Sequence, residues 1–209
     1  MKTENKSMIF TEEEGKKIFF TSDSHFHHEN IIKYCRRPFK NIEEHDAELI
    51  RRWNEKVPED GIVFHLGDVG FGNPQTINEI LNQLNGTIYL VIGNHDWRSI
   101  VKNHSWRFRE MTQQINMKIG KQHIILNHYP LLCFSGAWRG IDATWQLFGH
   151  VHTSPYTDEG LDQQRLKMLF TTQYDVGVDN NDFTPVSYNE VKQIIENQQM
   201  SLGMCRNEL

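Results

Sequence analysis

Apolar side chains recur along the chain in patterns that predict β-strands. The segments 16–23, 61–68, 87–96 and 144–152 are largely apolar and rich in β-branched or aromatic residues, which is typical of buried strands. Segment 114–130 alternates between apolar and polar positions around a glycine, which predicts a hairpin. Segment 167–179 predicts one or two further strands. Residues 7–10 are expected to form a hairpin with segment 16–23, with Gly15 in the turn.

Apolar residues at helical spacing predict four helices, over 28–35, 42–57, 73–86 and 187–199. Pro74 fits the first turn of the third helix, and Ser187 with Glu190 forms the capping-box pattern that begins the fourth. The order of elements predicts a layered α/β domain, with helices covering two packed sheets. We expect residues 1–209 to form a single domain.

Composition narrows the class of protein. The 209 residues are 38% hydrophobic and 23% charged, which is ordinary for a globular protein, and the net charge of −5 argues against extended nucleic-acid binding and against an anionic membrane. No apolar run approaches the ~18–20 residues of a membrane span, and the N-terminus lacks a signal-peptide core, so we expect a cytoplasmic protein. Cys35, Cys133 and Cys205 are too far apart for a thiolate zinc site.

Polar, metal-capable side chains follow five of the predicted strands. They are Asp23, His25, Asp68, Asn94, His95, Asp96, Asn127, His128, His150 and His152. In open α/β sheets ligands bind at the carboxyl ends of strands, so we expect these groups to converge. Imidazole, carboxylate and amide ligands without thiolate suit Mn, Fe, Zn, Co or Ni.

The sequences "DSH" and "HVH" each place two ligands two residues apart. In an extended chain both side chains face the same way, so each pair can bind one ion from one strand. The set holds more ligands than one ion needs, which indicates two metals. A lone histidine at a strand end is most often structural, but burying five such endings without partners would cost several kcal/mol.

The series "DSH…GD…GNHD…NH…GHVH" resembles the calcineurin-like metallophosphoesterase superfamily, whose blocks it contains in order from Asp23 to His152. The segments "SDSHFHHENIIKYCRRPF" and "VGVDNNDFTPVSYNEV" are similar to a small bacterial and phage branch of it, which often has Asn where this chain has Asp175. The resemblance implies a β-sandwich of two mixed sheets flanked by helices.

The resemblance also implies roles for the motif residues. Asp23, His25 and His152 would hold the first of two metals, Asn94, His128 and His150 the second, and Asp68 would bridge them. His95 would contact the phosphoryl group and protonate the leaving oxygen, and Asp96 would orient His95. We expect Trp97, next along the chain, to serve packing.

The expected activity is metal-dependent hydrolysis of phosphoester bonds, with a metal-activated hydroxide as nucleophile. The resemblance leaves monoester and diester open, with a slight preference for diester. The substrate would be a small phosphoester, and a nucleotide is one candidate. We expect His28, Arg36 and Arg37 to line its phosphate pocket. Two alternatives stay open: a non-catalytic metal-binding scaffold of the same fold, and a two-metal hydrolase of amides.

Overall fold

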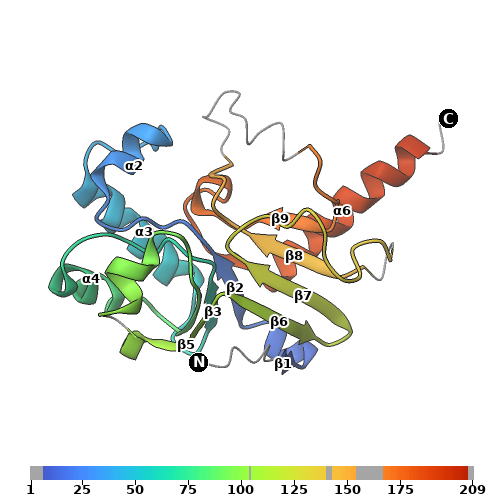
Figure 1. Ribbon diagram of the computed structural model, residues 1–209, viewed down its shortest axis with the longest axis horizontal. Coiled ribbons are helices and arrows are strands. Elements are labelled where there is room, and N and C mark those ends of the chain that lie inside the picture. Colours follow the sequence, from blue (N-terminus) through green and yellow to red (C-terminus); the bar gives the residue numbers. More distant parts are fainter. Residues whose placement is uncertain (1–6, 104, 140–142, 154–166, 207–209) are drawn as a thin grey trace.

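Two five-stranded sheets form the framework of the protein in the computed structural model, which describes residues 7–103, 105–139, 143–153 and 167–206 (Figure 1). The first sheet has the order β1-β6-β7-β8-β9 and consists of β1 (Ser7–Phe10), β6 (Gln114–Ile119), β7 (Gln122–Asn127), β8 (Trp145–Phe148) and β9 (Gln173–Asp175). The second has the order β10-β2-β3-β4-β5 and consists of β10 (Val186–Ser187), β2 (Ile18–Thr21), β3 (Ile62–His65), β4 (Thr87–Val91) and β5 (Phe108–Thr112). Each sheet has parallel and antiparallel pairs, which confirms the expected two mixed sheets.

Side chains alternate across the strands of the second sheet and so feed two separate cores. Ile18 and Phe20 of β2 pack with Leu126 and Leu147 of the first sheet, so one core lies between the sheets. Phe19 points the other way, into a second core. Helix α6 (Tyr188–Arg206) adds to the first core, and α3 (Ile42–Lys56) and α4 (Pro74–Leu81) cover the outer face of the second sheet. Helices therefore flank the two sheets.

The predicted helices begin where their capping residues indicate. Asn41 accepts a hydrogen bond from the Glu44 backbone at the start of α3. Asn73 caps α4, whose first residue is Pro74. The helix predicted over 28–35 is α2 (Glu29–Tyr34), and the Ser187–Glu190 capping box precedes α6. Helix α4 ends at Leu81, several residues before the predicted end at residue 86.

The hairpin predicted between residues 7–10 and 16–23 is wrong. Strand β1 pairs in parallel with β6, in the other sheet from β2. Between them lies the short helix α1 (Glu12–Gly15), which begins with a capping box between Thr11 and Glu14. Gly15 therefore ends a helix turn instead of forming a hairpin turn.

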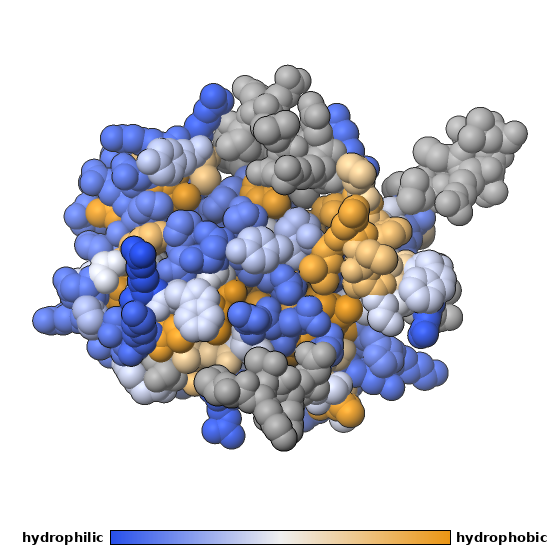
Figure 2. All heavy atoms as spheres, in the orientation of Figure 1, coloured by the Kyte–Doolittle hydropathy of each residue, from blue (hydrophilic) through white to orange (hydrophobic). Residues whose placement is uncertain are grey.

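Several elements carry no pattern that predicts them. Strand β5 has charged and polar side chains at most positions. A π-helix, η1 (Trp97–Val101), follows the "GNHD" sequence after β4. The described part of the chain also contains two short 3₁₀ helices, η2 (Ser105–Arg107) and η4 (Val178–Asn180). Among the described residues no helix combines the length and apolar character that crossing a membrane requires. The face shown in Figure 2 is largely hydrophilic, with hydrophobic side chains gathered near its centre and right.

Candidate metal centre

The polar loops that follow the strands converge between the two sheets. Strands β2, β3 and β4 run parallel in adjacent register, as do β7 and β8, so their carboxyl ends share an edge in each sheet. The loops contact one another directly: the backbone N–H of Asp23 donates to Gly67 O at 2.9 Å, and that of His150 donates to Asp23 Oδ2 at 2.8 Å. The expected convergence of the strand ends is thus present.

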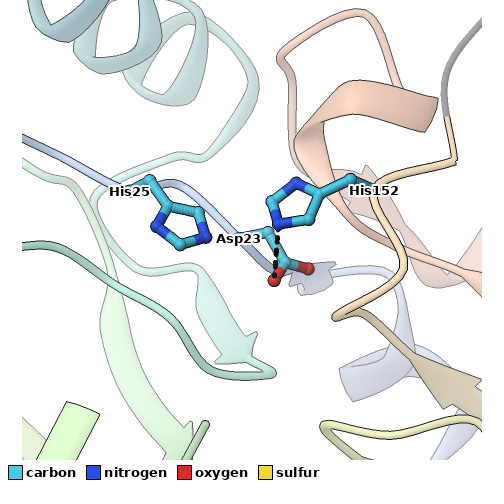
Figure 3. Close-up of side chains that lie close together, drawn as sticks. All are labelled: Asp23, His25 and His152. Atoms are coloured by element: carbon cyan, nitrogen blue, oxygen red, sulfur yellow. Dashed lines mark ion pairs between the residues drawn. The ribbon is translucent and has the colours of Figure 1, made fainter. Parts of the chain in front are cut away.

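Six of the seven proposed ligand residues form two groups. Within each group, the donor atoms lie within 4.8 Å of one another. The first is Asp23, His25 and His152, and the second is Asp68, His128 and His150. Figure 3 shows the rings of His25 and His152 turned toward the Asp23 carboxylate from opposite sides, with His152 Nε2 at 3.9 Å from Asp23 Oδ1. Asn94 Oδ1 lies 2.9 Å from His128 Nε2 and so joins the second group.

The two histidines of "HVH" belong to different groups, which agrees with the roles that the resemblance implies and contradicts the expectation from strand alternation that such a pair binds one ion. The reason is backbone conformation. Strands β2 and β8 end before the ligands, and five of the seven proposed ligands have positive φ, from 48° to 72°. Those five are Asp23, His25, Asp68, His150 and His152. Strand alternation does not apply to left-handed residues, and such strain, at about 1–3 kcal/mol each, is typical of functional sites.

One oxygen of Asp68 stands between the two groups. Asp68 Oδ2 lies 3.7 Å from His25 Nε2 and 3.6 Å from His128 Nε2. The other oxygen, Oδ1, accepts the backbone N–H of His95 at 2.9 Å, which fixes the carboxylate. The Asp68 carboxylate therefore faces both ligand groups.

The Nδ1 hydrogen bonds of two histidines fix which ring nitrogen faces the ligand groups. His128 Nδ1 lies 2.7 Å from Leu66 O, and because a carbonyl only accepts, Nδ1 carries the hydrogen. His152 Nδ1 lies 2.8 Å from Asp179 Oδ2 in the same way. In each ring Nε2 is then the nitrogen turned toward the ligand group.

Buried polar atoms without hydrogen-bond partners show that the first group suits a cation. Asp23 Oδ1 and His25 Nε2 are both fully buried and lack a partner among the described residues. Buried polar atoms are almost always satisfied, and a bound cation would satisfy both of these neighbouring metal-capable atoms. The nitrogen and oxygen donors of both groups therefore fit divalent metal ions.

The pKa shifts of the buried groups also favour cation binding at the centre. Burial, the nearby His152 and the Arg37 charge hold the pKa of His25 well below 6.5, so this ring is neutral and ready to bind a metal. Burial, with the neighbouring Asp23 carboxylate, raises the pKa of Asp68. Burial and the same Asp23 charge raise the pKa of Asp175 to about 6. Cations would relieve this accumulation of buried negative charge.

A third group of metal-capable atoms consists of Cys35, His152 and Asp179. Its acceptors are already used, because Asp179 takes two hydrogen bonds from Arg37 and one from His152 Nδ1. The unpartnered atoms belong to the Asp23 group instead. The Asp23 group is therefore the better candidate for the ion that His152 binds.

Two glycines of the motifs allow these loops to approach closely. A Cβ on Gly93 would lie 2.3 Å from Asp68 Oδ1, and one on Gly149 would lie 2.3 Å from Asp23 Oδ2. Gly93 has no positive φ, so it is the close approach to Asp68 that requires a glycine there. Any side chain at either position would displace a proposed metal ligand.

The resemblance implies that Asp96 orients His95, but no hydrogen bond of the described residues joins the Asp96 carboxylate to the His95 ring. The fully buried Asp96 carboxylate accepts three backbone N–H groups, from Gly93 at 2.8 Å and from Asp68 and Val69 at 2.9 Å. Asp96 thus ties the "GNHD" loop to the "GD" loop. The His95 side chain is 47% exposed, with Nε2 4.0 Å from Asp68 Oδ2, so it faces the centre from the solvent side.

The three residues predicted to bind the substrate phosphate lie in different environments. Arg37 is buried, and its guanidinium donates only to protein groups, so the expected contact with substrate does not fit. His28 lies at the edge of the centre, with Nδ1 3.3 Å from His25 Nδ1. Arg36 is exposed, and its role stays a prediction.

A hollow of about 500 Å³ opens beside His95. It is lined by Phe71, Asn94, His95, Trp97, Arg98 and Ser99. Trp97 is 51% exposed, which contradicts the expectation that it serves packing alone. The Phe71 ring stands 5.0 Å from that of His95 and stacks on that of His25 at 5.7 Å. The hollow therefore places aromatic surface next to the centre.

Sequence reasoning missed the residues that support the ligands from behind. Asp179 and His45 contact Arg37, and Asp175 accepts the Thr153 backbone N–H at 3.2 Å, next to His152. His65 is a structural histidine: its Nε2 lies 2.9 Å from Ser24 Oγ, and burial lowers its pKa to about 3. The only available signal was the resemblance of "VGVDNNDF" to the branch, which carried no role for Asp179.

Comparisons with known proteins find relatives of this chain by sequence and by structure. The chain is 32% identical over 183 residues to the uncharacterized protein MJ1445 of Methanocaldococcus jannaschii, covering 87% of this chain and 92% of that one. It is 35% identical over 130 residues to the gene 66 protein of Mycobacterium phage L5, covering 54% of this chain and 62% of the phage protein. No protein-family model matches the chain.

The solved structure of the Aquifex aeolicus protein of unknown function AQ665 has the same fold, with a TM-score of 0.65 and 25% identity over 85% of this chain and 98% of that one. The five motifs occur in order on two packed mixed sheets, with their ligand residues gathered at one centre. The chain belongs to the same family as the archaeal protein, and its five motifs resemble those of the calcineurin-like metallophosphoesterase superfamily.

Proposed function

We propose that this protein is a phosphoester hydrolase that works with two metal ions. The observation that carries the proposal is the position of Asp68 Oδ2, at 3.7 Å from the His25 Nε2 of one ligand group and 3.6 Å from the His128 Nε2 of the other. One carboxylate oxygen between two nitrogen-rich groups supports a dinuclear centre. Mn, Fe, Zn, Co and Ni all suit the donors.

Two ions bound there would offset the charge of phosphate oxygens and lower the pKa of an attacking water. The chain's own part is to hold the ligands in place. Asp96 and His95 N–H fix the Asp68 loop, and the Asp179 carboxylate fixes the His152 ring. These contacts fix the two ligand groups relative to each other.

His95 is the proposed catalytic acid. Its ring reaches the centre, with Nε2 4.0 Å from Asp68 Oδ2, yet 47% of the side chain is exposed and free to meet a substrate. A protonated imidazole there would contact a phosphoryl oxygen and give its proton to the departing oxygen. No covalent link to the enzyme is needed for this reaction.

The hollow beside His95 supports a phosphodiester as substrate. The group that departs on the His95 side would enter it, between the Phe71 and Trp97 rings, with Arg98 at the wall. An aromatic leaving group stacks on such rings, and Arg98 suits a further anionic group. The substrate class we propose is a small diester with a flat ring on its leaving group, of which a nucleotide is one example.

The test is a substrate panel on protein freed of metal with a chelator and reloaded with Mn²⁺. The panel contains p-nitrophenyl phosphate, bis-p-nitrophenyl phosphate, p-nitrophenyl phenylphosphonate, a 2′,3′-cyclic nucleotide and a p-nitroanilide. We expect the diesters to be cleaved fastest, and no activity before reloading. Cleavage of the anilide alone would identify an amide hydrolase. Two bound ions with no activity on any ester would indicate a non-catalytic metal scaffold.

A further inference from the structure

A buried arginine joins three parts of the chain behind the first ligand group. Arg37 is 4% exposed, and each of its five N–H groups has an acceptor. Nε and Nη2 donate to the two oxygens of Asp179, both at 2.8 Å. Nη1 donates to Ser24 O at 2.9 Å and contacts His45 Nε2 at 2.7 Å, and Nη2 also donates to Asp23 O at 2.7 Å. A guanidinium engaged in this way has no donor left for a substrate.

The contacts to the Asp23 and Ser24 carbonyls act on the "DSH" loop. Asp23 and His25 have φ of 57° and 50°, conformations that side chains of L-residues adopt at a cost. Charge-assisted hydrogen bonds to the two carbonyls between these residues hold the peptide units in place. Arg37 thereby keeps the first two ligands of the group directed inward.

The contact to Asp179 acts on the third ligand. Asp179 Oδ2 accepts both Arg37 Nη2 and His152 Nδ1, each at 2.8 Å. Both Asp179 oxygens accept hydrogen bonds from Arg37, so the carboxylate acts as an acceptor toward His152 as well, and the Nδ1 hydrogen of that ring points to it. Nε2 of His152 is then left facing Asp23 at 3.9 Å.

We infer that Arg37 and Asp179 together position all three ligands of the first metal, and that Arg37 does not bind substrate. The inference rests on the proposed metal centre. The pair touches no residue of the second group in any hydrogen bond of the described chain. The two metals should therefore differ in their dependence on it.

The variants to test are Arg37→Lys and Asp179→Asn. Lysine keeps a positive charge beside Asp179 but cannot reproduce the five-donor fork. Asparagine offers one acceptor oxygen where the carboxylate uses two. Arg107→Met is the matched control, because Arg107 is a partly buried arginine that donates to the carbonyls of Leu81 and Leu84, which belong to neither ligand group.

The readout is calorimetric titration of metal-free protein with Mn²⁺, together with the melting temperature. We expect both site variants to bind one ion 10–100-fold more weakly, the usual effect of removing a ligand's hydrogen-bond partner, with the second ion unchanged. The control should lose stability and keep both affinities. Equal weakening of both ions, or wild-type affinity for both, would overturn the inference.

Nitrogen NMR of the His152 ring, in metal-free protein labelled at histidine, separates this inference from the proposed function. We expect a slowly exchanging Nδ1–H in the wild type that is lost in Asp179→Asn and retained in the Arg107→Met control. If the wild type bound no metal, the proposed function would fail while this signal still reported the Asp179–His152 link. If the Asp179→Asn spectrum matched that of the wild type, the positioning role would be wrong whatever the metal content.

Discussion

The carboxylate of Asp96 accepts the backbone N–H of Asp68 at 2.9 Å, so the residue after the proposed acid holds the loop of the proposed bridging ligand. The same carboxylate accepts the N–H groups of Val69 and Gly93. Asp96 and Asp68 thus lock two strand-end loops of neighbouring strands β3 and β4 to each other. This contact makes the bridging position independent of how the His95 ring is oriented.

Asp96→Asn should reduce stability rather than act through His95. The amide keeps one acceptor oxygen and turns a donor toward backbone N–H groups, so about 1–3 kcal/mol of unfolding free energy should be lost. Urea unfolding measures the loss. A variant of wild-type stability in which only reactions with poor leaving groups are slowed would show that Asp96 acts on the imidazole after all.

His95→Asn should keep both metals and the fold, and lower kcat roughly 10²–10⁴-fold, the scale of lost acid–base assistance. The loss should depend on the leaving group. A p-nitrophenolate departs without a proton, so its ester should suffer less than an alkyl ester. Equal slowing of both esters would mean that His95 binds the phosphoryl group without donating a proton. Loss of an ion would make it a ligand.

Asp68→Asn should weaken both ions together, because Asp68 Oδ2 faces both ligand groups. Elemental analysis after Mn²⁺ reloading should fall from two ions per chain toward none. The control is Asp60→Asn, since Asp60 is an exposed aspartate paired with Lys17 at the surface. If Asp68→Asn lost a single ion and kept the other at full affinity, Asp68 would not be a bridge.

Metal binding should strengthen as pH rises. Burial by itself lowers the pKa of His152, but its hydrogen bonds with Asp179 and Cys35 and the Asp23 charge raise it well above 6.5. The metal-free ring is then protonated at neutral pH, and an ion must displace the Nε2 proton. One such proton makes the affinity of the first ion rise about tenfold per pH unit until the raised pKa is passed.

The same shift has an opposite sign for the stability of the metal-free protein. The folded pKa of His152 lies above the unfolded value, so its contribution to stability is complete below about pH 6.5 and is lost as pH rises through the folded pKa.

Calorimetry in buffers of different ionisation enthalpy counts the protons that metal binding releases. His123→Asn, at an exposed position of β7, should release as many as the wild type. Metal affinity that does not change between pH 6 and 8 would refute the shift.

Trp97→Ala should raise KM for diesters with an aromatic leaving group several-fold and leave an alkyl diester unaffected, because only the aromatic group stacks in the hollow. Steady-state kinetics on the two substrates measures the contrast. Trp106→Ala is a suitable control, since Trp106 is 59% exposed and does not line the hollow. A uniform effect on both diesters would assign Trp97 to the fold.

Local sequence determined most of the helices and strands, and the types of ligand that follow the strands. Apolar runs such as that of β4 form strands because pairing in a sheet buries their side chains. Burial of apolar surface is the main driving force of folding. Asn41, Asn73 and Ser187 begin their helices because their side chains satisfy free backbone N–H groups within the next turn. Such short-range effects act within a few residues and can be predicted from the sequence.

Tertiary structure alone decided how these parts combine. The partner of β1 is β6 rather than β2, since packing in the other sheet outweighs proximity along the chain. Strand alternation places His150 and His152 on one ion, whereas positive φ divides them between the two ligand groups, as the family resemblance implies. Arg37 and Asp179 lie 142 residues apart, and no local pattern shows that they meet. Such residues meet only when the strands pair in the correct order and register, and that pairing depends on the packing of the whole core.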